Sequence, residues 1–399
     1  MFMGPITFKL LPNIAFLSRL ILAFFIFNYS VLLAQNKSIV LLNDPEIQFE
    51  VTEAMNQMYN FQFLKADSQF YIMKRKYPNH PLPFFLLGYS QYWRIMPNEE
   101  SENFDPKFMA YMDTVIDLAD KIYSKDNKNF EALFFLAGAN AFRGRRLSDR
   151  EKWTAATFAG RNALKYLRLS REYNEFSPEF LFGEGLFNYY SAWIPENYKA
   201  LKPLMWFFPK GEKKTGIEYL KQASSNAFYT RVEAQHYLTR ILIFEEKRDA
   251  EALPIIQYLN KTYPSNPVFH RLYARLLFSM GSNVDYEKVS LEILNRINEK
   301  WPGYEETSGR YASFFLGWTY RYTDREKSKI YFKKSIEYSE KIGAVTMNYY
   351  YYSLSALAKM ADEDKDKQAA KIYYKKIKDN AGRSHEMHKE ARKYLKEND

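Results

Sequence analysis

Histidine and acidic residues near the C-terminus come nearest to known metal-binding patterns. Residues 385–388 (His-Glu-Met-His) have the residue types of the H-E-x-x-H zinc motif, but one residue is missing, so the general-base geometry is not reproduced. Residues 362–366 hold aspartates at alternate positions, as at the start of an EF-hand calcium loop. That loop needs glycine and glutamate where this chain has Lys367 and Tyr373. The spacing excludes both sites, and we expect no metal and no other cofactor.

The sequence patterns that could support catalysis also lack the spacing or the residues that their chemistry needs. Residues 211–216 (Gly-Glu-Lys-Lys-Thr-Gly) have the composition of a phosphate-binding loop without its spacing, and no strand is expected before them. The G-x-S-x-G signature of serine hydrolases is absent, and five histidines among 399 residues offer little general-base chemistry. The chain has no cysteine and therefore no thiol nucleophile. We predict that the protein is not an enzyme.

Small residues recur along the chain in a register that also includes prolines. Ala54 and Gly88 are 34 positions apart, as are Arg240 and Ala274, and both Gly88 and Ala274 lie 10 positions after a proline. A fixed period of this length is typical of stacked helical hairpins, none of which can bury its apolar face alone. No segment shows sustained two-residue alternation, so almost no sheet is expected. The register predicts an all-α fold, a right-handed superhelical solenoid of antiparallel helix pairs.

Seven helix pairs follow from this register, and a charged tail ends the array. Polar inserts interrupt two pairs, at residues 96–106 and 143–152; the second insert is either a long turn or an extension of a helix. The tail should form the polar cap that a repeat array needs. The expected pairs lie at residues 46–80, 81–125, 129–178, 232–266, 267–303, 308–343 and 345–380, and the tail at residues 381–399.

The helix pairs resemble the tetratricopeptide repeat (TPR) family over most of residues 46–380. Phe84 and Phe134 replace the consensus tryptophan and inserts break the period, so the chain is identified as a divergent member. It is similar to exported TPR proteins of Bacteroidota type. The matching positions are Leu87, Gly88, Leu316, Gly317 and Tyr320 on first helices, and Ala66, Phe70, Pro78, Ser290, Leu294 and Pro302 on second helices.

The TPR resemblance implies a binding groove lined by the first helix of each pair. TPR proteins bind a peptide or a partner protein there, and arginine beside aromatic side chains can grip a carboxylate while it stacks on apolar groups. The Lys and Asn set of carboxylate-clamp TPR domains is not found. The same aromatic residues could instead form the core between repeats. The predicted groove residues are Tyr89, Tyr92, Phe135, Phe142, Arg271, Arg275, Trp318, Arg321, Tyr349 and Tyr352.

Residues 179–230 break the rhythm of the repeats. Three prolines interrupt this apolar stretch, which suggests a folded excursion instead of an exposed linker. It is either a non-standard hairpin whose aromatic residues plug the solenoid or an element that grips a ligand or touches a membrane. Part of it is similar to a eukaryotic TPR group implicated in clearing lipid droplets and inclusion bodies, a likeness too short to imply a function. The aromatic residues concerned are Trp193, Trp206, Phe207 and Phe208.

The N-terminus has the pattern of a secretory signal peptide. Lys9 and Arg19 precede an apolar run at residues 20–34, and polar residues follow. The run is shorter than the ~20 residues of a membrane span. Cleavage after Ala34 and retention as an anchor both stay open, and residues 35–45 would be a short linker. The absence of cysteine favours a bacterial periplasm and excludes a lipoprotein anchor.

Net charge and domain order complete the functional prediction. The charge of +10 comes from bases scattered among acids, so we expect no nucleic-acid partner and leave peripheral membrane contact open. We predict an exported scaffold of the bacterial cell envelope that binds a peptide or protein; the alternative is a lipid- or membrane-surface-binding protein that uses the excursion. The predicted order is signal peptide 1–34, linker 35–45, N-terminal hairpins 46–178, excursion 179–230, C-terminal hairpins 231–380 and capping tail 381–399.

Overall fold

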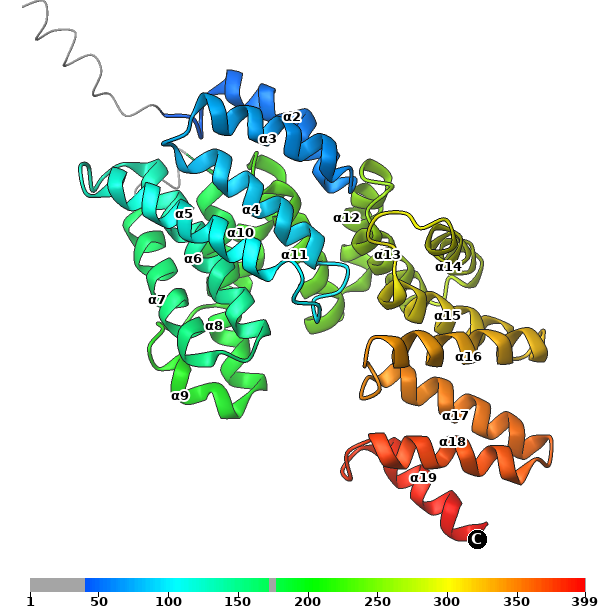
Figure 1. Cartoon of the computed structure of the whole chain (residues 1–399). Coiled ribbons are helices and arrows are strands. Elements are labelled where there is room, and N and C mark those ends of the chain that lie inside the picture. Colours follow the sequence, from blue (N-terminus) through cyan, green and yellow to red (C-terminus); the bar gives the residue numbers. More distant parts are fainter. Residues whose placement is uncertain (1–39, 172–176, 399) are drawn as a thin grey trace, which may run out of the picture. The chain divides into compact units, whose positions relative to one another are not determined.

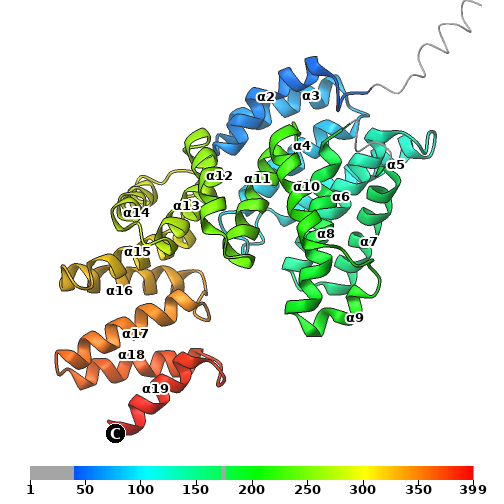
Figure 2. The same cartoon turned by 180° about the vertical axis from the view of Figure 1, so that it is seen from behind.

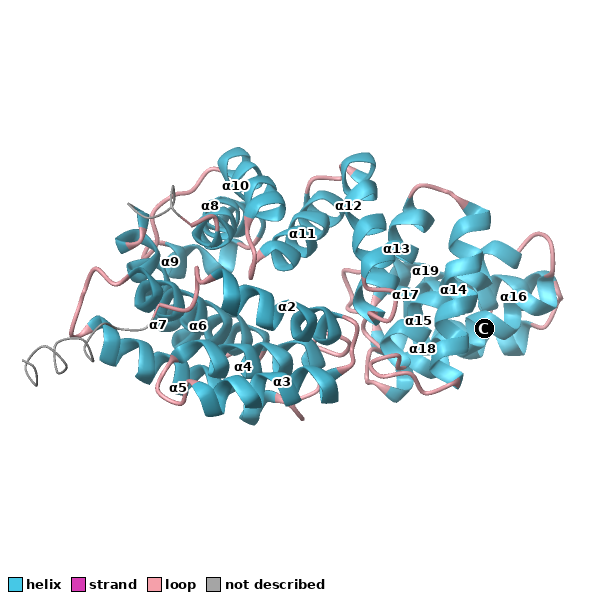
Figure 3. Cartoon of the chain, turned by 90° about the horizontal axis from the view of Figure 1, so that it is seen from above, coloured by secondary structure: helices cyan, strands magenta, loops and turns pink. Residues whose placement is uncertain are grey.

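Helices make up the regular structure of this chain in the computed structural model, which describes residues 40–171 and 177–398 (Figure 1). Loops join the helices, and these residues contain no strand (Figure 3). The helices of the first half are α2 (Pro45–Tyr59), α3 (Phe63–Lys76), α4 (Pro81–Ile95), α5 (Asp105–Tyr123), α6 (Phe130–Asp149), α7 (Trp153–Leu169), α8 (Glu179–Asn197), α9 (Lys202–Met205) and α10 (Lys213–Asn226).

The second half continues in the same manner, and consecutive helices contact one another throughout. These helices belong to one unit that begins at Leu42. The predicted all-α solenoid of helix pairs is therefore confirmed. The remaining helices are α11 (Arg231–Arg240), α12 (Asp249–Thr262), α13 (Pro267–Ser279), α14 (Asn283–Asn298), α15 (Glu306–Tyr320), α16 (Arg325–Lys341), α17 (Asn348–Glu363), α18 (Lys367–Asn380) and α19 (Glu386–Glu397).

Local sequence explains where helices begin and how closely they pair. The side chain of Asn266 accepts hydrogen bonds from the first backbone N–H groups of α13, and Pro267 follows it at the first helical position. Within the pair α15 and α16, a Cβ on Gly317 would lie 2.7 Å from the ring of Phe332. The small residue of the repeat register is therefore what lets this ring pack against the neighbouring helix.

Residues 179–230 contain two regular helices that cross very closely. A Cβ on Gly216 of α10 would lie 2.6 Å from the backbone nitrogen of Tyr189 and 2.8 Å from the carbonyl oxygen of Gly185, both on α8. The two helices contact each other along their length. Pro195 lies in the last turn of α8, and the irregular part is the connection 198–212, which holds the 3₁₀ turn η2 (Lys199–Leu201) and α9.

The inserts and the two ends of the chain have distinct structures. Residues 143–149 extend α6, and Arg146 and Arg150 bind Asp105 and backbone carbonyl groups of the preceding loop. The charged tail forms α19, which packs on α18. The predicted signal peptide lies outside the described residues. In residues 40–171 and 177–398, the structure has no helix with the length and apolarity that crossing a membrane requires.

The first two helix pairs fold back against helices far along the sequence. Tyr59 on α2 accepts a hydrogen bond through its carbonyl oxygen from Asn266 Nδ2 (2.8 Å), and Trp93 on α4 packs edge-on against Phe269 of α13, with ring centroids 5.3 Å apart. Tyr89 on α4 hydrogen-bonds to α11. Figure 2 shows α11 and α12 beside α2 and α4. The inner face of α4 is thus covered by helices of the same chain.

Candidate functional site

A wide groove lies on the first helices of the last pairs. This C-terminal groove has a volume of about 960 Å³ and is lined by α13, α15 and α17, together with Phe244 and Met387. The aromatic residues Phe314, Trp318 and Tyr349 form its wall: the rings of Phe314 and Tyr349 lie 4.5 Å apart, and those of Phe314 and Trp318 6.1 Å apart. Trp318 remains 39% exposed, so the wall is open to a ligand.

Three arginines of this groove make no ion pair in the described part of the chain. Arg321 lies flat over Trp318, with its guanidinium carbon 3.6 Å from the ring centroid. Arg310 is only 6% exposed, and its Nε and Nη1 donate no hydrogen bond. Arg275 lines the same groove. By contrast, Arg325 at the edge binds Glu363 (2.7 Å) and Asp364 (3.0 Å). The groove therefore carries positive charge with unused donors.

Half of the predicted groove residues meet in the C-terminal groove: Arg275, Trp318, Arg321, Tyr349 and Tyr352. Burial raises the pKa of Tyr349, and the nearby charges of Arg275 and Arg310 oppose that rise. Arg310 and Tyr311 are not among the residues predicted from the sequence. Both precede Trp318 by about two helical turns on α15, so helical spacing from this predicted residue would have found them.

The other predicted groove residues take part in contacts within the chain. Tyr89 and Tyr92 are buried between α4 and α11, where Tyr92 OH lies 3.2 Å from Tyr237 OH, and Phe135 is fully buried. Arg271 donates hydrogen bonds to the Pro97 carbonyl oxygen (3.2 Å) and to Ser308 Oγ (3.0 Å). Phe142 packs on Tyr92 at 4.9 Å between ring centroids.

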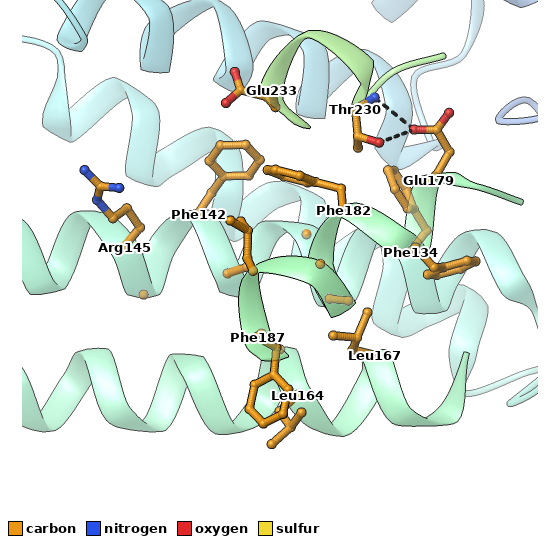
Figure 4. Close-up of a pocket in the computed structure, with 18 of the residues that line it drawn as sticks. Phe134, Phe142, Arg145, Leu164, Leu167, Glu179, Phe182, Phe187, Thr230 and Glu233 are labelled. Carbon is orange, nitrogen blue, oxygen red and sulfur yellow. Dashed lines mark hydrogen bonds between the residues drawn. The ribbon is translucent and has the colours of Figure 1, made fainter. Parts of the chain in front are cut away.

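A second site, the inner pocket, lies among α4, α6, α7, α8 and α11. Its volume is about 350 Å³, and its walls are almost wholly apolar. Small residues on facing helices leave the space, and phenylalanine and leucine side chains line it. In Figure 4, Leu164, Leu167 and Phe187 are drawn on one side of this pocket, and Glu233, Thr230 and Glu179 on the other. The small residues are Ala137, Gly138, Ala141, Gly160, Ala163 and Gly183.

Two buried carboxylates of the inner pocket differ in their hydrogen bonds. Glu179 accepts four, from the backbone N–H groups of Phe228, Tyr229 and Thr230 and from Thr230 Oγ1 (2.9 Å). Glu233 accepts one, from Tyr89 OH to Oε1 (2.5 Å). Its Oε2 has no donor in hydrogen-bonding geometry, and the indole N–H of Trp93, which has no acceptor, interacts with the same carboxylate. Burial raises the pKa of Glu233 to about 7, against the opposing effects of Tyr89, Trp93 and Arg145. Glu179 is therefore a structural cap, and Glu233 is left incompletely bound.

The aromatic residues of the excursion point in two directions. Phe208 lines the inner pocket and contacts Gly160, whereas Trp206 is 85% exposed and Phe207 58% exposed. Trp193 is half-buried against Tyr190 and Tyr198. The connection 198–212 therefore closes one side of the pocket and presents an aromatic tip to solvent.

The residues that resembled metal motifs have structural contacts. The Nδ1 of His385 accepts a hydrogen bond from Met387 N (3.1 Å) at the start of α19. Asp364 pairs with Arg325 and with Lys329, and Asp362 with Lys367. Among the described residues, no three His, Asp or Glu side chains come together in a way that could hold a metal ion.

Comparisons with known proteins give likeness in fold only. No protein-family model and no curated protein matches the sequence. Among solved structures, the human IFIT1 dimer with PPP-AAAA is 16% identical with a TM-score of 0.41, covering 79% of this chain and 68% of that one. A Sel1 repeat protein from Oxalobacter formigenes is 13% identical with a TM-score of 0.31, covering 91% and 97%. At such values these likenesses assign no family and no partner, and the chain's own helix pairs carry the description as a helical-repeat protein.

Proposed function

We propose that the protein is a non-enzymatic scaffold whose C-terminal groove binds an extended segment of a partner protein. The bound segment would contain both acidic and aromatic residues. The observation that carries this proposal is the set of unpaired cations Arg275, Arg310 and Arg321 within an aromatic wall. Export to a bacterial cell envelope, suggested by the N-terminal sequence, is part of the same proposal.

The guanidinium of Arg310 argues for a carboxylate ligand. A buried charge without a partner is costly, and the N–H groups of Nε and Nη1 can each donate a hydrogen bond to a carboxylate oxygen. Neither nitrogen has an acceptor in the described part of the chain. An acidic side chain of a ligand would supply what the fold does not.

The aromatic wall argues for a peptide with large apolar side chains. Tyr352 is 40% exposed and Trp318, which has the Arg321 guanidinium over its ring, is 39% exposed, so both aromatic rings can contact a ligand. Rigid aromatic and arginine side chains dominate binding energies at protein interfaces. The groove follows the first helices of three successive units, which is a surface for an extended chain instead of a compact one.

Fluorescence anisotropy with labelled peptides tests this proposal. The probe is a twelve-residue peptide of alternating Asp and Phe, compared with one in which Asn replaces Asp. We expect saturable binding of the acidic peptide to the full chain and at least tenfold weaker binding by Arg275→Ala/Arg321→Ala, because each charge-assisted hydrogen bond contributes about 1.5–3 kcal/mol. The matched control, Arg383→Ala/Arg392→Ala, removes equal charge from exposed positions outside the groove.

Two results would overturn the peptide proposal. Equal weakening by both double variants would mean that net charge alone, and not the groove, attracts the peptide. Tighter binding of a single-stranded oligouridylate than of the acidic peptide would mean that the arginines and aromatic rings serve phosphates and bases instead.

The exposed aromatic tip supports a second candidate function, peripheral membrane contact. Trp206 and Phe207 stand in solvent beside exposed Lys199, Lys202 and Lys210, a pairing of aromatic and basic residues suited to an anionic interface. Flotation with vesicles of phosphatidylcholine and phosphatidylglycerol should recover the wild-type chain and lose Trp206→Ala/Phe207→Ala. The control Trp153→Ala/Phe158→Ala removes the same ring types from exposed positions of α7. Equal flotation of both variants would remove this candidate.

A further inference from the structure

We infer that the inner pocket is a binding site for a single-chain apolar molecule with an uncharged, hydrogen-bond-donating head group, such as a long-chain alcohol. The apolar walls would take the chain, and the free Oε2 of Glu233 would accept the hydrogen bond from the head group. This site is separate from the C-terminal groove and does not depend on its function.

The size and lining of the pocket suit an apolar chain. An engineered cavity of about 150 Å³ lined by aliphatic and aromatic side chains stays dry and binds benzene. The inner pocket, at about 350 Å³, is more than twice as large and lies within the range of small-molecule sites. Ala141 is exposed at its wall, so the space opens to solvent.

The position of Glu233 fixes where the head group would lie. This carboxylate is 1% exposed, and its Oε2 has no donor in hydrogen-bonding geometry, whereas the neighbouring Glu179 accepts four hydrogen bonds. The nearby indole N–H of Trp93 interacts with the carboxylate without completing a hydrogen bond of that geometry. A buried polar atom left without a hydrogen bond costs about 1–3 kcal/mol, and a ligand hydroxyl that donates to Oε2 would recover that free energy.

The charges around Glu233 exclude an ionised head group. A carboxylate ligand would meet Glu233 and Glu179. Arg145, the only cation among the described residues that line the pocket, already contacts Tyr237 OH (2.9 Å) and Asp149 (3.0 Å). An ammonium head group would be attracted by Glu233, but Arg145 already acts on this carboxylate and would repel a second cation, and the ammonium would lose its hydration in an apolar pocket. An uncharged donor avoids both repulsions and the cost of burying an ion.

The connection 198–212 links the pocket to the exposed aromatic tip. Phe208 lines the pocket, and the two residues before it are exposed.

Isothermal titration calorimetry of the full chain tests this inference with three probes of equal chain length. 1-Decanol should bind one molecule per chain with a negative heat-capacity change. Decanoate and decylammonium should each bind at least tenfold more weakly at pH 8. Ala141→Leu and Ala163→Leu, which fill the pocket from two helices, should each weaken 1-decanol binding at least tenfold, while Ala155→Leu on the exposed face of α7 should not.

Each remaining outcome would overturn the inference. Absence of saturable 1-decanol binding would show that the pocket takes no apolar chain. Undiminished binding by both folded filling variants, as judged by circular dichroism, would place the ligand elsewhere. Tighter binding of decanoate or decylammonium than of 1-decanol would refute the uncharged head group.

Discussion

The C-terminal groove and the inner pocket are built from the same kind of helix pair but offer opposite chemistry. In the groove, Arg275, Arg310 and Arg321 supply donors without acceptors. In the pocket, Glu233 supplies an acceptor without a donor. The inner faces of α15 and α17 remain open, whereas the inner face of α4 is covered by α11 and α13. A repeat face that is covered by another part of the chain thus forms a smaller, apolar pocket where an uncovered face forms a peptide-sized groove.

The sharpest test of this comparison is whether the two sites can be lost separately. Arg275→Ala/Arg310→Met/Arg321→Ala should weaken binding of the acidic peptide at least a hundredfold, since three charge-assisted contacts are removed. The same variant should bind 1-decanol as the wild type does. Conversely, Ala141→Leu should lose 1-decanol and keep the peptide. Anisotropy and calorimetry on both variants measure this reciprocity, and a coupled loss would contradict two independent sites.

The pH dependence of stability should distinguish the buried carboxylate of the pocket from the cations of the groove. Because the pKa of Glu233 is raised to about 7 from 4.5, the protonated form favours the folded state. This contribution is present below pH 4.5 and is lost as pH rises through 7. Relative to Glu233→Gln, the free energy of unfolding of the wild type should fall by about 3 kcal/mol between pH 4 and pH 8.

Urea denaturation of both chains at several pH values measures this difference. The side chains that interact with Glu233 are those of Tyr59, Tyr89, Tyr92, Trp93 and Arg145. Burial raises the pKa of the three tyrosines, so they stay neutral in this range. Burial also lowers the pKa of His236, which lies about one turn further along α11. Titration of His236 occurs in both chains and cancels to first order. A difference independent of pH would show that Glu233 is ionised like an exposed carboxylate.

The stability of the fold should depend more on the close crossing of α8 and α10 than on the contact of Gly88 with Met112. Gly216→Ala should lower the free energy of unfolding by about 2 kcal/mol, because its Cβ would meet backbone atoms of Tyr189 and Gly185 and the helices must separate. Gly88→Ala should change it by less than about 1 kcal/mol, since its nearest contact is the flexible end of Met112 and helix propensity improves. Thermal unfolding of the two variants compares them directly; similar costs would contradict the backbone contact.

The smallest expected change in the free energy of unfolding comes from a substitution in the C-terminal groove. Arg310→Met keeps the length of the side chain and removes a buried charge that has no partner, so the free energy of unfolding should rise by about 1 kcal/mol while peptide affinity falls. Gain of stability with loss of binding is the signature of a residue kept for a ligand. A loss of stability would mean that Arg310 has a structural role in the free protein.

Much of the architecture, but little of the pocket, could be predicted from the sequence. Helix pairs are local, so the small residue Gly317 and its partner Phe332 were visible as a repeat register. The contact between Tyr89 and Glu233 spans 144 positions and leaves no periodic signal. The sequence around Ala137 and Gly138 carries no signal of a cavity, because whether they border one depends on which helix lies opposite.

The fold-back of α2 and α4 makes the first part of the chain behave unlike a linear array. In such arrays, each unit depends only on its neighbours, and unfolding can begin at either end. Here Tyr59 is bound to Asn266, 207 positions away, so detaching α2 breaks a contact with the start of α13. Amide hydrogen exchange should therefore be slow in α2, up to the global unfolding free energy, and faster in α18 and α19, whose hydrogen bonds and ion pairs join them to the nearby helices α16 and α17. The N-terminal end of the array is thus anchored by a long-range contact, and the C-terminal end is free to fray. During synthesis, α2 is made more than two hundred residues before Asn266, its partner in this contact.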